Sequence, residues 1–227
     1  MSIQTIQLKQ ATEDEILIFM RDQATEELSE VGQAQFEFPK SHDFPPLYTL
    51  QPNPTTRLAQ NQKWSRTIQL YCRYHFLFRL SLPNCLDLPL FKNLRIRKRL
   101  VESDVREVLT WVASEEGGRR GEWVGKDVFL VYWNSPEEWA ELIWRWVNEA
   151  GHKGAVLTFY ELLQGDATAG QGAFISRNLH SELPFAYRRT AFHEMDADLF
   201  AKCMAALAKR GKAQVFGEQD SQGVKFF

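Results

Sequence analysis

Apolar and polar positions alternate along the chain in a pattern that predicts one order of elements twice. Apolar residues recur every three or four positions in four stretches, which predict helices over residues 55–78, 103–116, 136–150 and 196–210. Shorter apolar runs bounded by turn residues predict the other elements, namely strands over 90–96 and 155–157, a short helix over 159–163, and hairpins over 122–133 and 213–227.

Several helix starts are marked by side chains that can accept hydrogen bonds from free backbone N–H groups. Thr55 or Thr56 is the expected cap of the first long helix, and Ser103 that of the second. Two later helices begin with a capping box, formed by Ser135 with Glu138 and by Thr158 with Glu161. These signals fix where the predicted helices begin.

A shift of about 95 residues superimposes the two halves of this pattern. It lays Val105 on Phe200, Leu109 on Met204, and Phe129 on Val224. Helices followed by a small hairpin are typical of a winged-helix unit, a variant of the helix-turn-helix. We therefore predict an α+β fold with two tandem winged-helix domains preceded by a Pro-rich arm.

The predicted domains divide the chain into three parts. Residues 1–35 are rich in Asp and Glu and predict a loosely held acidic extension. Residues 36–134 hold the Pro-rich arm and the first winged-helix domain. Residues 135–227 hold the second, with an inserted loop over about 165–190.

The Pro-rich arm holds five of the nine prolines, between Phe36 and Pro54. Proline fixes φ and pushes the preceding residue to extended conformations, so we predict a stiff, polyproline-like arm with no packed element of its own. Such a segment loses little entropy on docking, which suits a ligand for a partner protein. The alternative is an arm folded back on its own domain, with its aromatic residues as a satellite core. Pro45 to Tyr48 also matches the PPxY ligand of WW domains.

Charge and composition weigh against nucleic-acid binding. The net charge is −2, whereas a nucleic-acid-binding domain is normally strongly basic. The helix before the first wing carries several acids, which would repel phosphate. The basic run from Arg95 to Arg99 is interpreted first as a solvated or protein-facing patch, and second as a contact for nucleic acid or anionic lipid. The alternative function is that of a winged-helix regulator that binds nucleic acid.

Motifs for catalysis or metal binding find little support. His193 begins a His-Glu-Met-Asp run, but no second histidine follows at the spacing of a zincin helix. The three cysteines, Cys72, Cys85 and Cys203, lack CxxC spacing and predict reduced, buried thiols. We therefore expect no enzyme activity, no cofactor and no metal, in a soluble cytoplasmic protein.

Six stretches together resemble one known family. They are Phe44–Asn53 with Arg57, Trp64, Pro89–Asn93, Pro136–Trp139, Thr158–Leu162 and Gly223–Phe227. On them the chain resembles the vacuolar protein sorting-associated protein 25 family, the small subunit of the endosomal sorting complex ESCRT-II. The resemblance runs from about Phe36 to Phe227. Residues 1–35 look like an added extension, and the segment from Gln171 to Thr190 looks longer than the family's loop.

The resemblance implies a subunit used for protein contact. In that family the Pro-rich arm docks into hydrophobic pockets on the two larger ESCRT-II subunits, and two copies join one core. The corresponding residues here are Phe36, Phe38, Pro39, Phe44, Pro45, Pro46, Leu47 and Tyr48. The second winged helix recruits the first ESCRT-III subunit through that subunit's N-terminal helix, for which Trp144, Asp196 and Asp198 are candidates. The implied role is sorting of ubiquitinated cargo into multivesicular bodies, at endosomal membranes contacted only through the complex, with no nucleic acid bound.

Overall fold

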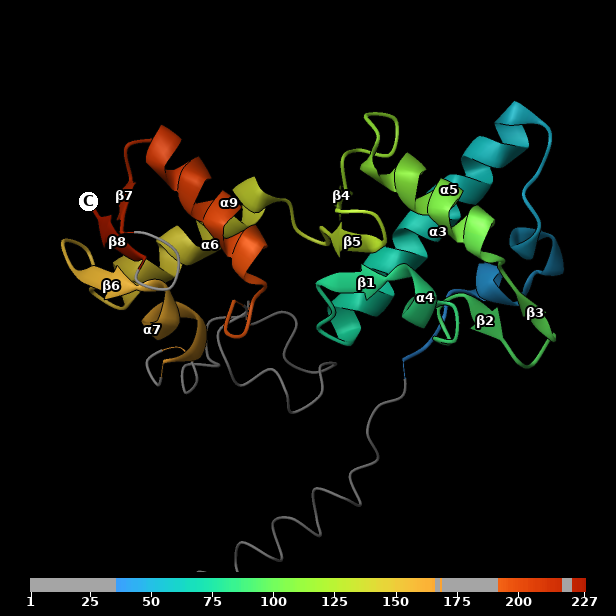
Figure 1. The fold of residues 1–227 in the computed structure, drawn as a ribbon, viewed down its shortest axis with the longest axis horizontal. Helices are drawn as coiled ribbons and strands as arrows, with labels where there is room; N and C mark the ends of the chain where they lie inside the picture. Colours follow the sequence, from blue (N-terminus) through green and yellow to red (C-terminus); the bar gives the residue numbers. More distant parts are fainter. Residues whose placement is uncertain (1–35, 166–167, 169–191, 218–221) are drawn as a thin grey trace, which may run out of the picture. The chain divides into compact units, whose positions relative to one another are not determined.

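The computed structural model describes residues 36–165, 168, 192–217 and 222–227 (Figure 1). The predicted acidic extension over residues 1–35 and the predicted insertion over 171–190 lie outside the described residues. The described elements follow the order that the sequence pattern predicts twice.

The first repeat begins with its long helix and ends with a small antiparallel sheet. Its elements are α3 (Pro54–Tyr74), β1 (Arg79–Ser81), α4 (Leu82–Cys85), α5 (Glu102–Ala113), β4 (Gly121–Val124) and β5 (Val128–Val131). The strand order is β1-β5-β4, with Phe129 of β5 opposite Leu80 on one side and Trp123 on the other. Figure 1 shows α3 and α5 beside this sheet.

The second repeat has the same plan. Its elements are α6 (Pro136–Glu149), β6 (Val156–Thr158), α7 (Phe159–Gln164), α9 (Ala197–Lys209), β7 (Ala213–Phe216) and β8 (Gly223–Phe226). The strand order is β6-β8-β7, with Val224 of β8 opposite Leu157 and Val215. Val224 therefore occupies the position of Phe129, as the shift of 95 residues predicts, and the tandem winged-helix fold is confirmed.

The buried faces of the helices follow the predicted apolar stripes. On α5 and α9 the inward residues are fully buried, namely Val105, Val108, Leu109 and Val112 on the first helix and Phe200, Cys203, Met204 and Leu207 on the second. Each such side chain stabilises the fold by about 1.5–3 kcal/mol relative to an exposed one. Both predicted capping boxes are present, at the starts of α6 and α7.

The start of the first repeat differs from the prediction in two places. The helix expected to reach residue 78 ends at Tyr74, and Phe76 adopts a left-handed φ of 55° that lets the chain turn into β1. The strand expected over residues 90–96 is instead a hairpin of β2 (Lys92–Asn93) and β3 (Lys98–Arg99). The Asn93 side chain accepts hydrogen bonds from the backbone N–H groups of Arg95 and Ile96, which turns the chain.

Two helix caps also differ from the prediction. The Asn53 side chain, rather than Thr55 or Thr56, accepts hydrogen bonds at the start of α3. Helix α5 begins at Glu102, so Ser103 lies inside it, and the capping residue Val101 makes no side-chain hydrogen bond. Within the described part of the chain, no helix is long and apolar enough to cross a membrane.

Candidate protein-binding surface

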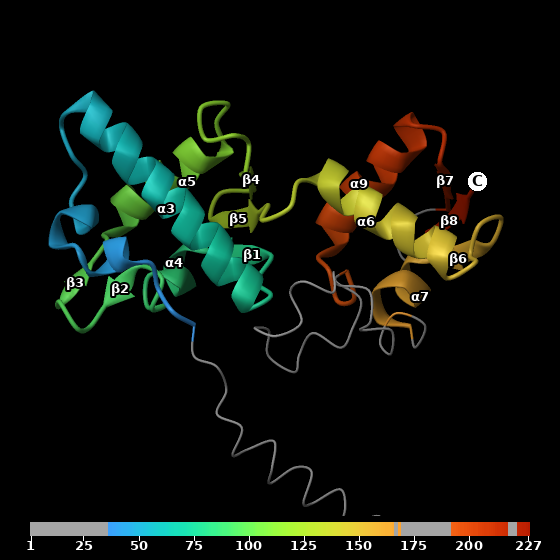
Figure 2. The ribbon, with the colours of Figure 1, turned by 180° about the vertical axis from the view of Figure 1, so that it is seen from behind.

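The Pro-rich arm is folded rather than extended. It forms two short 3-10 helices, η1 (Lys40–Asp43) and η2 (Pro45–Tyr48), so the predicted polyproline arm without packed elements is wrong. Phe44 is extended, which the following proline favours, while Pro45 supplies the fixed φ of the first helical position. Figure 2 shows this arm in blue, near β2 and β3.

Leu47 and Tyr48 are buried in the core of the first repeat. The Trp64 Nε1–H donates a hydrogen bond to the Leu47 carbonyl at 3.1 Å, and the rings of Tyr48 and Trp64 meet edge to face at 5.5 Å. The Tyr48 hydroxyl donates to the His42 carbonyl at 3.0 Å. Burial raises the pKa of Tyr48, so the phenol stays neutral. Residues at the end of the arm are thus part of the domain.

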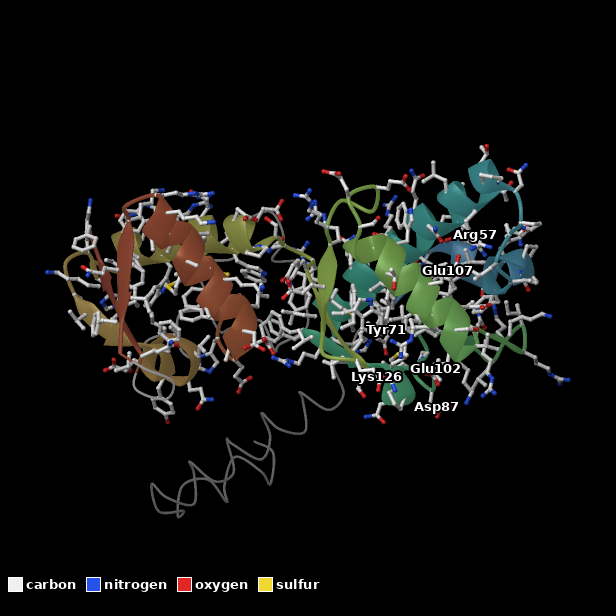
Figure 3. The ribbon with its side chains drawn as sticks, turned by 45° about the horizontal axis from the view of Figure 1, so that its top comes forward. Arg57, Tyr71, Asp87, Glu102, Glu107 and Lys126 are labelled. Carbon is white, nitrogen blue, oxygen red and sulfur yellow. The ribbon has the colours of Figure 1, made fainter. Side chains whose placement is uncertain are left out.

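Polar side chains of α3 form hydrogen bonds with the backbone of η2 and of the residues that follow it. The Gln60 amide nitrogen donates to the carbonyls of Leu47 at 2.8 Å and Thr49 at 2.9 Å, and its oxygen accepts from the Gln51 N–H at 3.1 Å. The Arg57 guanidinium donates to the Gln51 carbonyl at 2.8 Å and forms an ion pair with Glu107 of α5 (Figure 3). The arm is therefore held along its whole second half.

A buried polar cluster joins η1 to the β2–β3 hairpin. His42 is buried, with Nε2 donating to the Leu90 carbonyl at 3.1 Å and Nδ1 accepting from the Asn93 amide at 3.1 Å. This pairing requires the neutral ring with its proton on Nε2. Burial lowers the pKa of His42, which agrees with that state.

The same cluster fixes a charge pair at the surface. The Asn93 amide also donates to Asp43 at 3.1 Å, and Arg95 forms an ion pair with the same carboxylate. The Asn93 hydrogen bond and then Arg95 lower the pKa of Asp43. Since the Asn93 oxygen is occupied by two backbone N–H groups, its amide orientation is set on both sides.

The start of the arm packs on the end of α3. The rings of Phe36 and Phe38 meet edge to face at 4.8 Å, and both contact Tyr71, at centroid distances of 5.3 and 5.7 Å. Phe38 also stacks on His42 at 3.9 Å. The Pro39 carbonyl accepts a hydrogen bond from the His42 N–H at 2.8 Å. Phe36 and Phe38 therefore anchor the arm to its own domain, and the Pro39 carbonyl closes the turn of η1.

The remaining arm residues are exposed. Phe44 has 54% of its surface exposed, and Pro45 and Pro46 are exposed beside it. Of the eight predicted contact residues, four thus pack on the domain, Pro39 is half-buried within the arm, and three are exposed. A WW domain reads the tyrosine of its ligand, and Tyr48 is only 5% exposed, so this use of the motif would require the arm to unfold.

The three candidate residues of the second repeat all have partners within the chain. Trp144 is partly buried, with the ammonium groups of Lys153 and Lys212 over its ring at 5.6 and 5.2 Å. The Asp196 carboxylate caps α9, and both Asp196 and Asp198 pair with Arg79 of β1. Each of the three therefore already has a contact within the chain, and their role in binding a partner stays a prediction.

An apolar groove on the second repeat was not predicted. It has a volume of about 480 Å³ and is lined mainly by Ala201, Ala205 and Ala208 of α9 with Phe159 and Val215. Four large apolar side chains of the same repeat are exposed: Val156, Tyr160, Phe216 and Phe227. The sequence signal was the row of small residues on α9, opposite its buried stripe.

The described residues offer neither a cluster of metal ligands nor a reactive thiol. Among residues 36–165 and the described segments beyond them, no group of three His, Cys, Asp or Glu side chains could hold a metal ion. All three cysteines are buried and free, and burial raises the pKa of each thiol, that of Cys85 to about 11. Such thiols are poor nucleophiles because the thiolate is the reactive form.

The fold and this surface define a tandem winged-helix protein with a folded N-terminal arm that presents apolar residues. Residues 41–176 match the family model of the ESCRT-II complex subunit. The chain belongs to this family of ESCRT-II subunits, and its similarity to vacuolar protein-sorting-associated protein 25 (VPS25) extends over most of its length. The predicted family is confirmed.

Individual relatives agree with this assignment. VPS25 of Xenopus laevis is 35% identical over 196 residues, which cover 85% of this chain and 99% of the relative. VPS25 of Homo sapiens is 32% identical, with 85% and 98% covered. The crystal structure of subunit VPS25 of the endosomal trafficking complex ESCRT-II has a TM-score of 0.64 at 25% identity, covering 84% of this chain and 98% of that one. A structure of ESCRT-II with VPS22, VPS25 and VPS36 is 24% identical, with a TM-score of 0.63, and supports the fold.

Proposed function

We propose that the chain is a non-catalytic ESCRT-II subunit that docks on VPS22 and VPS36 through Phe44, Pro45 and Pro46. The observation that carries this proposal is the division of the arm. Leu47 and Tyr48 are buried, and they hold the three preceding apolar residues outward in one conformation. A rigid ligand loses less conformational entropy on binding, so more of the contact energy is available for affinity.

The chemistry of the exposed residues suits a hydrophobic pocket. Phe44 provides an aromatic ring, and the two prolines have no backbone N–H group that would need a partner once water is excluded. Aromatic anchors at an interface centre typically contribute about 2 kcal/mol or more. The similarity to a chain of a solved ESCRT-II complex, at 26% identity, supports assembly into such a complex.

The second repeat supplies a separate binding surface in this proposal. Its groove is lined by small residues of α9 together with Phe159 and Val215. An apolar groove of this kind accepts an amphipathic helix. We assign it the N-terminal helix of the first ESCRT-III subunit, in sorting of ubiquitinated cargo into multivesicular bodies. In this role two copies join one core, and the protein acts peripherally at endosomal membranes.

Nucleic-acid binding is disfavoured by the helices that would contact DNA. Helix α5, on which Figure 3 labels Glu102 and Glu107, carries three acids, Glu102, Asp104 and Glu107, against one cation, Arg106, so it offers no positive surface to phosphate. On α9, Lys202 is paired with Glu122 of β4. We therefore keep protein contact as the function of both repeats.

The assembly claim is tested by co-purification with the VPS22–VPS36 pair. The variant is Phe44→Ala with Pro46→Ala, because Tyr48→Ala would damage the core as well as the interface. We expect the double variant to fold normally and to bind at least about 100-fold more weakly. Leu58→Ala, at an apolar α3 residue that is 42% exposed, is the matched control and should bind normally. Equal binding of the double variant would refute the docking role.

The groove is tested with Ala205→Arg, which fills it with a large charged side chain from an exposed position. We expect this variant to lose binding of the N-terminal helix of the first ESCRT-III subunit while still assembling with VPS22 and VPS36. Ala197→Arg, on the same helix but outside the groove lining, should retain both activities. Unchanged helix binding by Ala205→Arg would place that contact elsewhere.

A further inference from the structure

A basic hairpin projects beside the arm. We define it as residues 92–99, with strands β2 and β3 and the turn between them. Leu94 in this turn is 76% exposed, the largest exposed fraction among the large apolar residues described. Lys92 and Arg95 are neutralised by Asp87 and Asp43. Arg97, Lys98 and Arg99 are exposed, and within the described residues they form no ion pair.

The basic hairpin and the arm form one continuous surface. Asn93 of β2 donates hydrogen bonds to His42 and Asp43 of η1, and Arg95 pairs with Asp43. Strand β3 lies against η2, which contains Pro45 and Pro46 (Figure 2). The hydrogen bond from the Leu100 N–H to the Phe91 carbonyl, at 3.0 Å, closes the hairpin at its base. The three free cations are thus held next to the exposed apolar residues of the arm.

We propose that the basic hairpin is the second half of the docking surface and binds an acidic surface of the partner subunit beside the pocket for Phe44. This inference rests on the proposed docking function and adds the chemistry of the partner. An apolar centre bordered by charged groups is the usual composition of a protein interface. Arg97, Lys98 and Arg99 would form the charged border of this interface, and Leu94 would extend its apolar centre beyond the arm.

A protein partner fits these observations better than a lipid surface. The hairpin is joined by hydrogen bonds to the segment that enters a protein pocket, so both meet the same partner. On a membrane, three cations contribute only about 1 kcal/mol each, and the exposed leucine is a single apolar side chain. Anionic lipid is therefore an outcome of the test rather than the proposal.

Charges at the border of an interface act mainly on the association rate and its salt dependence. The test measures binding of the full chain to the immobilised VPS22–VPS36 pair at about 50 and 500 mM salt, which span strong and weak screening. The variant reverses three charges, Arg97→Glu, Lys98→Glu and Arg99→Glu. We expect its association rate at low salt to fall at least about 10-fold and to lose the salt dependence of the wild type.

The matched control reverses three exposed cations elsewhere, Lys126→Glu, Arg145→Glu and Lys209→Glu, with the same change in net charge. Its association rate should stay within about 2-fold of the wild type, because steering depends on where the charges lie. Circular dichroism of both triple variants checks that they fold. If the two variants slow association equally, net charge alone is responsible and the proposal is wrong.

The remaining outcomes separate this inference from the docking function. If the Phe44/Pro46 variant loses binding while the hairpin variant associates at the wild-type rate, docking by the arm stands and the hairpin proposal is overturned. If the wild type never binds the pair, both proposals fail. If the hairpin variant assembles normally but no longer floats with vesicles containing phosphatidylserine, the hairpin is a lipid contact and the proposal is likewise overturned.

Discussion

The first helices of the two repeats, α3 and α6, carry tryptophans at equivalent positions in different surroundings. A shift of 75 residues lays Trp64 on Trp139 and also Ile68 on Ile143, and all four side chains are buried. The Trp64 N–H is satisfied by the Leu47 carbonyl of the arm. The buried Trp139 N–H has no hydrogen-bond partner within the described part of the chain.

The difference shows what the arm contributes. The same fold occurs twice, and among the described residues only the first copy has its opening helix covered by a folded arm. The arm accepts the hydrogen bond of the Trp64 N–H, buries aromatic side chains and exposes Phe44, Pro45 and Pro46. The second copy instead exposes an alanine-lined groove on α9. The repeats therefore share a fold and differ in how their surfaces are used.

The largest expected loss of stability follows substitution of Tyr48, at the buried end of the arm. Tyr48→Ala should lower the free energy of unfolding by about 3–5 kcal/mol, because it leaves a cavity against Trp64. Phe44→Ala should change it by less than about 0.5 kcal/mol, since that ring is exposed. Urea denaturation measures both. Equal effects of the two changes would mean that the arm is not part of the core.

The two tryptophans provide the next comparison. Trp64→Phe and Trp139→Phe remove similar volumes, but only the first breaks a hydrogen bond, and the second removes an unpaired buried N–H group. We expect Trp64→Phe to be more destabilising by about 1 kcal/mol, since the Leu47 carbonyl keeps its hydrogen bond from Gln60. Chemical denaturation of the two variants in parallel gives the difference. A larger loss for Trp139→Phe would show that its indole has a partner.

Helix caps distinguish the repeats at the level of about 1 kcal/mol. Asp196 caps α9 with hydrogen bonds to the N–H groups of Asp198 and Leu199, whereas Val101 gives α5 no such bond. Asp196→Ala should destabilise by about 0.5–2 kcal/mol, and Val101→Asp should stabilise by about 0.5–1 kcal/mol. Thermal unfolding measures the stability change of both variants. Asp198→Ala is the control for the loss of a negative charge opposite Arg79. A destabilising Val101→Asp would contradict the uncapped start of α5.

A smaller, gradual effect concerns pH and the arm. Burial lowers the pKa of His42 below its ordinary value of 6.5, while the Leu90 hydrogen bond and Asp43 partly oppose that shift. The unfolded chain therefore binds more protons than the folded chain below pH 6.5, and stability falls as the pH decreases through that region. His42→Gln, which can still donate to Leu90 and accept from Asn93, should lose part of this dependence. The measurement is the urea midpoint between pH 5 and 8, and an unchanged pH dependence would exclude His42 as its source.

Local patterns predicted much of the scaffold and less of the candidate surface. The stripe on α9 and the capping boxes of Ser135 and Thr158 were readable because their partners lie within four residues in the chain. Strand β1 was missed because three residues after a long helix carry little signal of their own. The hairpin at Asn93 was missed because a single side chain turns the backbone within an otherwise strand-like run.

The two repeated winged helices and the family could be predicted from the sequence, because both depend on periodic stripes and on motifs in a fixed order. The conformation of the arm, in contrast, depends on contacts made in the folded domain. The prolines predict a stiff arm, but they do not determine which of its residues are buried against the domain. That choice depends on Trp64 and Gln60 meeting η2 and on Asn93, 51 residues from His42, meeting η1. Contacts over such separations exist only once the domain has folded around them.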